Sequence, residues 1–464
     1  AYPGPAVVAA TVWTMIQERA GDREGRHMLD DLGARCARAM AEHGCPSVSV
    51  AVAVHGKVVL AEAYGFADTG AGIPATTRTP YALASATKPV TAAAVCVAAD
   101  EGLLDLDAPG PLGATPRQLL RHRGGLGAHY DFHYGEEGEP AVDAEPYTRL
   151  LRAPGSGFEY ANLGYRLLGR LLEEATGQDL AGYARERVLG PLGLDGFRIA
   201  TACPGAATRY TPDGRPYPEG LRTSHPGATL GWATASQLAL FAQSWPRLLK
   251  PQTAAAVLDA VPIGGHLGYG LGWCVSRGEG PLLVSHGGGM GGVAAMAVSA
   301  PELGLSVAVL TNTTVKAARD AVVDHVLGEL VPGFAPELIS PVFSVPAHAA
   351  TVKEGEWAGH ASTPEGEVPL RLRILPGARA EVTTGGETAT APVDATATLV
   401  LRGSFPVQLP TADARVSSPV LGLELRPDEG RLTGVARVYK EGDREGLMGN
   451  LLTHPCELRL VRPD

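Results

Sequence analysis

The stretch Tyr81–Val90, with the sequence YALASATKPV, places a serine and a lysine inside an otherwise apolar run. Ser85 and Lys88 are three positions apart, so on a helix they share one face and the lysine amine can reach the serine hydroxyl. Small and apolar residues continue beyond them, and the pattern predicts a buried helix over residues 85–102 that Gly102 closes. The spacing is that of a serine nucleophile beside a basic group.

Segments on both sides of this helix are typical of antiparallel strands. Residues 46–68 contain two β-rich runs around His55 and Gly56, which is the pattern of a hairpin. Further short apolar runs, separated by glycines, are GYGLGWCVS, LLVSHGG, VAAMAVSA and LSVAVLTNT. Helices are predicted between them in TPRQLLRH, LGYRLLGRLLEEATG, DLAGYARERVLG and TASQLALFAQSW. We therefore expect an α+β fold in which helices flank one antiparallel sheet.

A change of composition divides the chain after this region. Residues 1–27 precede the first patterned segment as an N-terminal extension, and residues 28–332 form the first predicted domain. Residues 333–350 are rich in proline and predict a stiff linker. Residues 351–464 alternate apolar and polar side chains between frequent turn signals. This last segment predicts a small antiparallel β-barrel or sandwich without obvious catalytic groups.

Charge and composition exclude several classes of partner. The chain has 464 residues, 45% of them hydrophobic, and a formal net charge of −10. The length suits two soluble domains, and the acidic balance offers no basic face for nucleic acid or for a membrane surface. No run reaches the roughly 20 apolar residues that span a bilayer. The apolar run in residues 1–27 lacks the preceding positive charge of a signal peptide, so we expect a cytoplasmic protein that acts on small molecules or peptides.

The cysteines give no sign of a metal or disulfide framework. All six are scattered, and none forms a C-x-x-C pair. H-E-x-x-H is also absent, as is the G-x-S-x-G elbow of α/β-hydrolases. We therefore expect neither a metal nor an organic cofactor.

Two further motifs accompany Ser85 and Lys88. Tyr160 and Asn162 form the only Y-x-N in the chain, where a glycine-rich turn leads into a predicted helix. A tyrosine in such a place can act as base or proton shuttle when a nearby cation lowers its pKa. His286 ends a predicted strand, and the glycines that follow it allow backbone N–H groups to approach a substrate closely.

Together, the order Ser-x-x-Lys, Tyr-x-Asn and His-x-Gly resembles the serine β-lactamase and penicillin-binding-protein superfamily. The chain is most similar to its class C β-lactamase-like branch, which includes esterases, D-aminopeptidases, transacylases and thioesterases. The resemblance runs from about Pro46 to Thr313 and includes YGFAD, PGSGFEYANLGYRLLG, PLGL and YGLGW. It implies a β-lactamase/transpeptidase-like α+β fold, and the C-terminal segment resembles the lipocalin-like barrel appended to some members.

The resemblance also implies roles for the first two motifs. Ser85 would be the acylated nucleophile, and Lys88 and Tyr160 would be the proton-transfer pair. Asn162 would contact either the substrate amide or the lysine. A serine hydroxyl is a weak nucleophile, so Lys88 can serve as its base only if burial and a neighbouring cation lower the lysine pKa.

The third motif departs from the family pattern. His286 stands where relatives have a lysine, and the backbone N–H groups of Ser85 and Gly289, next to Gly288, would form the oxyanion hole. A histidine can be neutral near pH 7, so recognition of a substrate carboxylate is weakened. The substitution favours esterase, aminopeptidase or acyl-transfer chemistry over antibiotic hydrolysis.

The sequence thus predicts a serine hydrolase or acyltransferase that forms an acyl-Ser85 intermediate. The acyl donor would be an ester, thioester or amide of a small molecule or peptide, and water or an amine would resolve the intermediate. One alternative is a biosynthetic transacylase or peptide cyclase. Another is a non-catalytic, penicillin-binding-like sensor or scaffold. The sequence leaves the acyl donor and the oligomeric state open.

Overall fold

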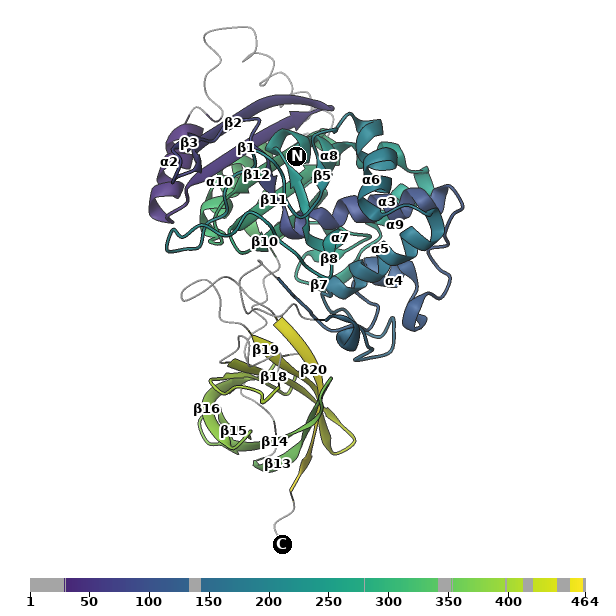
Figure 1. The fold of residues 1–464 in the computed structure, drawn as a ribbon, viewed down its shortest axis with the longest axis vertical. Coiled ribbons are helices and arrows are strands. Elements are labelled where there is room, and N and C mark those ends of the chain that lie inside the picture. The colour runs from purple at the N-terminus through teal and green to yellow at the C-terminus, as the bar shows by residue number, and fades with distance from the viewer. Residues whose placement is uncertain are drawn as a thin grey trace. The chain divides into compact units, whose positions relative to one another are not determined.

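The structure is a computed structural model that describes residues 29, 31–132, 143–278, 280–340, 352, 354–396, 399–411, 420–439 and 451–461. The predicted extension over residues 1–27 and residues 341–350 of the predicted linker lie outside this description. The chain divides into two compact units (Figure 1). The sheet unit comprises described residues of Ala1–Gly124 and Gly164–Pro341, and the barrel unit those of Gly125–Leu163 and Val342–Asp464.

The sheet unit is built on a nine-stranded sheet in the order β3-β2-β1-β12-β11-β10-β9-β8-β7. The predicted hairpin and the predicted late strands therefore belong to one antiparallel sheet. A separate small sheet has the order β4-β6-β5. The strands are β1 (Ser47–Val54), β2 (Lys57–Asp68), β3 (Ile73–Pro74), β4 (Tyr81–Ala82), β5 (Arg198–Ile199), β6 (Gly231–Ala233), β7 (Val261–Gly264), β8 (Leu267–Tyr269), β9 (Cys274–Ser276), β10 (Leu283–Met290), β11 (Val293–Ala300) and β12 (Leu305–Thr311).

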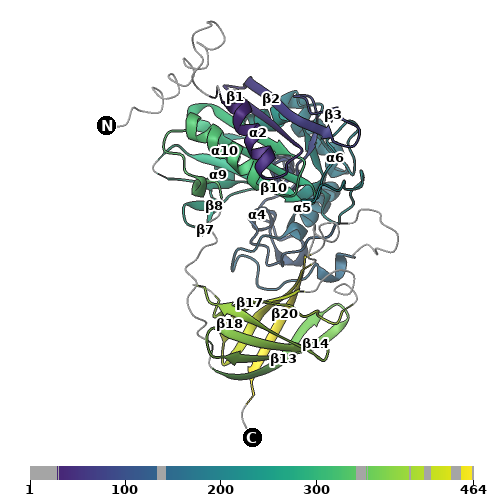
Figure 2. The same cartoon turned by 90° about the vertical axis from the view of Figure 1, so that its left-hand side faces the viewer.

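Helices cover both faces of this sheet (Figure 2). On one face, α2 and α10 pack against each other and against the valines of the central strands. On the opposite face, α8 packs on β1 and β12. The predicted cap of α8 is present, because the hydroxyl of Thr234 accepts a hydrogen bond from the N–H of Gln237. The helices are α2 (Leu32–Glu42), α3 (Lys88–Asp100), α4 (Pro116–Leu120), α5 (Asn162–Thr176), α6 (Leu180–Ala184), α7 (Pro226–Thr229), α8 (Ala235–Ser244), α9 (Pro251–Leu258) and α10 (Ala317–Leu330).

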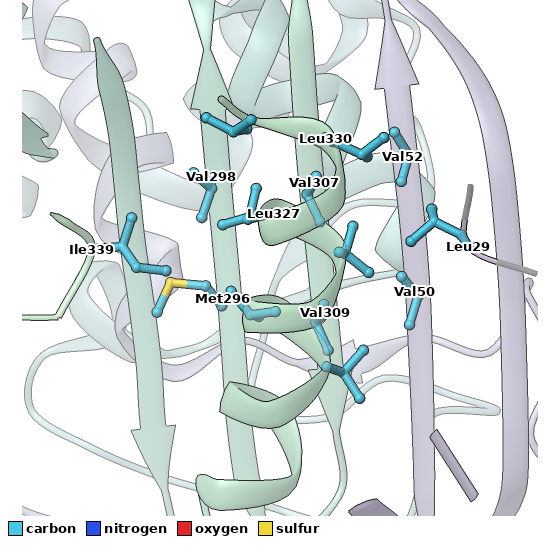
Figure 3. Close-up of a cluster of buried hydrophobic side chains, with 14 of the residues drawn as sticks. Leu29, Val50, Val52, Met296, Val298, Val307, Val309, Leu327, Leu330 and Ile339 are labelled. Carbon is cyan, nitrogen blue, oxygen red and sulfur yellow. The ribbon is translucent and has the colours of Figure 1, made fainter. Parts of the chain in front are cut away.

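The central strands alternate large and small side chains. Val52 of β1 lies opposite Val307 of β12, which lies opposite Val298 of β11, and all three are buried. Figure 3 shows Leu327 and Leu330 of α10 among these valines. Burial of each such side chain stabilises the fold by roughly 1.5–3 kcal/mol. Alanine and serine occupy the alternate positions, which lets α8 approach the sheet closely.

The helix that carries the serine and lysine begins later than predicted. Residues Ala84–Thr87 form a short 3-10 helix, η1, and α3 begins at Lys88. The φ of Ala84 is 47°, in the left-handed region that alanine rarely adopts, so the backbone turns sharply just before Ser85. At the other end, Gly102 has a φ of 77° and follows the last turn, as predicted.

The barrel unit contains a closed barrel of strands β13 to β20. Its last strand pairs with both β19 and β13, which completes the ring. Inward and outward residues alternate as predicted: Leu370 and Leu372 are buried, whereas Arg371 between them is exposed. The strands are β13 (Gly355–Thr363), β14 (Gly366–Leu375), β15 (Arg379–Thr384), β16 (Glu387–Asp394), β17 (Leu401–Phe405), β18 (Val420–Asp428), β19 (Arg431–Tyr439) and β20 (Leu451–Leu460).

Described residues of 125–163, which the sequence analysis assigns to the first domain, also belong to the barrel unit. The predicted α+β fold with a C-terminal antiparallel barrel is confirmed. Among the described helices, none combines the length and the apolar character needed to cross a bilayer. The six cysteines are free thiols, and all except Cys274 are buried.

Candidate active site

Ser85 lies in a turn that neighbouring hydrogen bonds hold closed. The hydroxyl of Thr87 donates to the carbonyl oxygen of Ala84 at 2.7 Å and accepts from the N–H of Gly231 on β6 at 2.8 Å. These two bonds fix η1 and attach it to the small sheet. The two bonds make the turn rigid. Ser85 itself is only half-buried, so a substrate can reach it.

Lys88 places its amine beside the hydroxyl of Ser85. Its Nζ lies 3.0 Å from the Oγ of Ser85 and 3.2 Å from the carbonyl oxygen of Ala228. The side chain is fully buried, and Nζ lies 5.5 Å from the centre of the Tyr165 ring. Burial lowers the pKa of Lys88 well below its ordinary value, because the charged amine loses its hydration. A neutral amine at hydrogen-bond distance can accept the proton of the Ser85 hydroxyl.

The glycines after His286 bring strand β10 against the serine turn. A Cβ at Gly288 would lie 1.9 Å from the carbonyl oxygen of Leu83 and 3.2 Å from the nitrogen of Ala86, so only glycine fits there. Strand β9 pairs with β10 only as far as Ser285. Within the described residues, no strand continues that edge beyond this point. A backbone edge of this kind can bind a substrate carbonyl through its N–H groups.

His286 is buried and neutral at physiological pH. Its Nδ1 lies 2.8 Å from the carbonyl oxygen of Gly287, which can only accept, so Nδ1 carries the proton. Its Nε2 lies 2.9 Å from the hydroxyl of Tyr269 and accepts the hydrogen bond that this hydroxyl donates. Burial, together with the nearby charge of Lys88, lowers the pKa of His286 to about 3. The third motif therefore contributes a neutral imidazole instead of a cation.

The second motif lies in the barrel unit. Tyr160 is half-buried, and Asn162 is fully buried as the first residue of α5. The Nδ2 of Asn162 donates to the carbonyl oxygen of His129 at 3.1 Å. The structure thus brings together Ser85, Lys88, His286 and Gly288 within the sheet unit. The participation of Tyr160 and Asn162 belongs to the proposal below.

The sequence motifs do not predict several residues that lie next to them in the structure. Tyr165 and Tyr269 line the surroundings of Lys88 and His286, and Glu159 forms a buried network beside Tyr160. Tyr269 belongs to YGLGW, one of the segments that carry the family resemblance. Its position in that segment could have indicated a place near the site. Within the described ranges, no three His, Cys, Asp or Glu side chains come together as a metal site.

Comparisons with known proteins identify the family of the chain. Residues 33–330 match the Beta-lactamase family. The chain is 34% identical over 203 residues to esterase EstB of Burkholderia gladioli, covering 37% of this chain and 51% of the esterase. It is 27% identical over 342 residues to an unguisins hydrolase of Aspergillus campestris, covering 61% of each. A D-aminopeptidase of Gluconobacter oxydans is 27% identical over 213 residues, covering 40% of this chain and 38% of that protein. The chain thus spans less than two thirds of the length of these relatives.

Solved structures extend the similarity to most of the chain. SurE with D-Leu aligns with a TM-score of 0.62 at 21% identity, covering 88% of this chain and 97% of SurE. An octameric penicillin-binding protein homologue from Pyrococcus abyssi aligns with a TM-score of 0.59 at 21% identity, covering 91% and 99% of the two chains. A class C beta-lactamase has a TM-score of 0.57 at 19% identity and covers 67% of this chain and 98% of its own. At these identities the similarity establishes the fold alone.

Proposed function

Because the chain belongs to the Beta-lactamase family, we propose that it is a serine hydrolase that cleaves an ester, thioester or amide through an acyl-Ser85 intermediate. The observation that carries this proposal is the distance of 3.0 Å between the Nζ of Lys88 and the Oγ of Ser85. It joins a half-exposed hydroxyl to a buried amine whose pKa lies well below its ordinary value. Relatives include an esterase and a D-aminopeptidase, which supports a small-molecule or peptide substrate.

Acylation follows from these positions. The Oγ of Ser85 attacks the carbonyl carbon while the neutral amine of Lys88 takes the hydroxyl proton. The negative charge that develops on the carbonyl oxygen is stabilised by the N–H groups of Ser85 and Gly289. When the tetrahedral intermediate collapses, the bond to the leaving group breaks and the acyl group remains on Ser85. Asn162 would contact the substrate amide or Lys88.

Proton transfer to the leaving group is the step that we assign to Tyr160. The proton held by Lys88 passes to the departing alcohol, thiol or amine, directly or through the Tyr160 hydroxyl. Water then attacks the acyl-Ser85 carbonyl, loses its proton to the same groups, and releases the acid. An amine that replaced water would yield an amide by the same route.

The neutral state of His286 supports a choice among substrates. An imidazole whose pKa is about 3 and whose Nε2 accepts from Tyr269 offers no positive charge to a carboxylate. We therefore propose an acyl donor that is uncharged next to the scissile carbonyl. A neutral His286 adds no positive charge next to Lys88, so it is burial that lowers the pKa of the amine.

Intact-protein mass spectrometry with an activated ester tests the proposal. The wild type is expected to gain the mass of one acyl group and to turn over, whereas Ser85→Ala gains none. Ser404→Ala, which changes an exposed serine of β17, is the matched control and should react like the wild type. Equal labelling of Ser85→Ala, or no reaction of the wild type with esters, thioesters and amides, would exclude the proposed nucleophile. Adding amines and measuring amide against acid separates transfer from hydrolysis.

A further inference from the structure

Glu159, the residue before Tyr160, is the centre of a buried ion-pair network. Its side chain is 8% exposed and forms ion pairs with Arg152 and, at 3.1 Å, with Arg437 of β19. Its Oε1 also accepts a hydrogen bond from the N–H of Ala128 at 3.1 Å. Burial of a carboxylate is strongly unfavourable without such partners. The network therefore fixes the side chain of Glu159 from several directions.

Arg437 joins the barrel wall to this network. Its side chain is 11% exposed and donates to Glu424 of β18 at 2.8 Å and to Thr453 of β20 at 2.9 Å. The hydroxyl of Thr453 in turn donates to the carbonyl oxygen of Ala128 at 2.6 Å. Arg437 of β19 and Thr453 of β20 thus contact residues of the 125–163 segment that contains Tyr160, and Glu424 of β18 pairs with Arg437.

Backbone contacts also attach the 125–163 segment, which contains Tyr160, to β20, the last barrel strand. Tyr130 and Leu451 exchange two backbone hydrogen bonds, each 2.9 Å long. The side chain of Asn162 reaches the carbonyl oxygen of His129, next to this bridge. Both members of the Tyr-x-Asn motif therefore lie in a segment whose conformation depends on barrel residues.

Arg437 differs from other arginines of the barrel. Arg371, for example, pairs with Glu356 on the outer surface, where the two side chains are 65% and 41% exposed. Pairs of that kind contribute little, because water screens them. A buried, charge-assisted network next to a motif residue is instead a means of fixing one geometry.

We propose that Arg437 is a positioning residue of the proposed reaction: by holding Glu159, it fixes the place of Tyr160. The inference rests on the proposed function, because that proposal assigns proton transfer to Tyr160. Reacting groups must be held closely, and a displacement of about 1 Å costs on the order of 100-fold in rate. Loss of Arg437 should therefore act on the rate constant of the reaction more than on substrate affinity.

The test compares Arg437→Met with Arg371→Met in the full-length protein, using an activated ester. For Arg437→Met we expect kcat to fall by about 10-fold to 100-fold with a change of KM below about 3-fold. Arg371→Met should match the wild type. Arg437→Lys, which keeps the charge, should recover part of the loss, and it replaces Arg437→Met if that variant does not fold. Circular dichroism and thermal unfolding establish that each variant compared is folded.

A second background separates positioning from general damage. If Arg437 acts through Tyr160, Arg437→Met lowers kcat in the wild type but has little further effect on Tyr160→Phe. An equal loss in both backgrounds, or a kcat of folded Arg437→Met equal to that of Arg371→Met, overturns the inference. Failure of the wild type to form an acyl adduct would instead refute the proposed function, so the two failures are distinguishable.

Discussion

Lys88 and Glu159 are both buried ionisable residues beside a motif, but the protein surrounds them in opposite ways. Lys88 lies under the Tyr165 ring, and burial lowers the pKa of its amine toward the neutral form. Glu159 forms ion pairs with the guanidinium groups of Arg152 and Arg437. Burial without compensation suits a group that must accept a proton, whereas ion pairs suit a group that must hold a backbone in place.

Of the changes that test this comparison, removal of the Lys88 amine should have the largest effect. Lys88→Met keeps the approximate volume but removes the base, so the rate of acyl-Ser85 formation should fall by about 10²–10⁴-fold. The midpoint of thermal unfolding should stay level or rise, because a buried amine is replaced by an apolar group. Lys57→Met, at an exposed lysine of β2, is the control. A large fall in the unfolding midpoint with normal acylation would contradict the comparison.

Removal of the charge of Glu159 should lower the stability, whereas Lys88→Met should leave it unchanged or raise it. Glu159→Gln removes the charge and leaves half-buried Arg152 and buried Arg437 against a neutral amide. We expect the free energy of unfolding to fall by up to roughly 3–5 kcal/mol, because both arginines lose an ion pair and, among the described residues, only Arg437 keeps a second one, with Glu424. Denaturant unfolding of this variant beside Lys88→Met measures both signs in one experiment. Equal stabilities of Glu159→Gln and the wild type would remove the proposed distinction.

Two adjacent glycines of β10 test how much the close packing of β10 against η1 contributes to stability and acylation. A Cβ at Gly288 would meet the backbone oxygen of Leu83 at 1.9 Å, whereas a Cβ at Gly287 would meet only the flexible end of Met296 at 3.4 Å. Gly288→Ala should therefore lower stability by about 1–3 kcal/mol and slow acylation, because β10 must move away from η1. Gly287→Ala should stay close to the wild type. Adduct formation and thermal unfolding of the two variants check this expectation.

The most gradual effect is a pH dependence of stability from His286, because it is spread over several pH units. Its pKa is about 3 in the folded protein against an ordinary 6.5, so the unfolded chain binds the proton first as the pH falls. Stability should therefore decrease between pH 6.5 and about 3, by at most about 1.4 kcal/mol per pH unit from this residue. Unfolding of the wild type and His286→Gln at several pH values measures the difference. Identical slopes for the two proteins would show that His286 is not the group responsible.

Periodicity explains why much of the fold could be predicted. The alternation of valine with alanine and serine in β1, and of leucine with arginine in β14, indicates strands with two distinct faces. Thr234 is followed three residues later by Gln237, the spacing of a capping box, and both hydrogen bonds are present. Ser85 and Lys88 could also be predicted as neighbours, because three positions of separation fix their proximity on any helical turn.

Other features depend on contacts that no local pattern carries. The left-handed conformation of Ala84 has no signature in its residue type, so the helix was expected three residues too early. Glu159 and Arg437 are 278 positions apart, and arginines elsewhere in the barrel, such as Arg371, are exposed. The burial that makes His286 neutral likewise arises from packing around Tyr269 and Lys88. Sequence motifs predict the reacting groups, whereas tertiary structure decides their charge and support.

The barrel unit is discontinuous along the chain, and this has a consequence for biosynthesis. Described residues of 125–163 leave the ribosome long before Arg437 and Thr453 exist, because chains are made from the N-terminus. The network around Glu159 therefore cannot close until translation has passed Thr453. A nascent chain, or one terminated before that point, would carry Ser85 and Lys88 without the finished support of Tyr160. Under the proposed mechanism, translation order itself delays hydrolytic competence until β20 has been made.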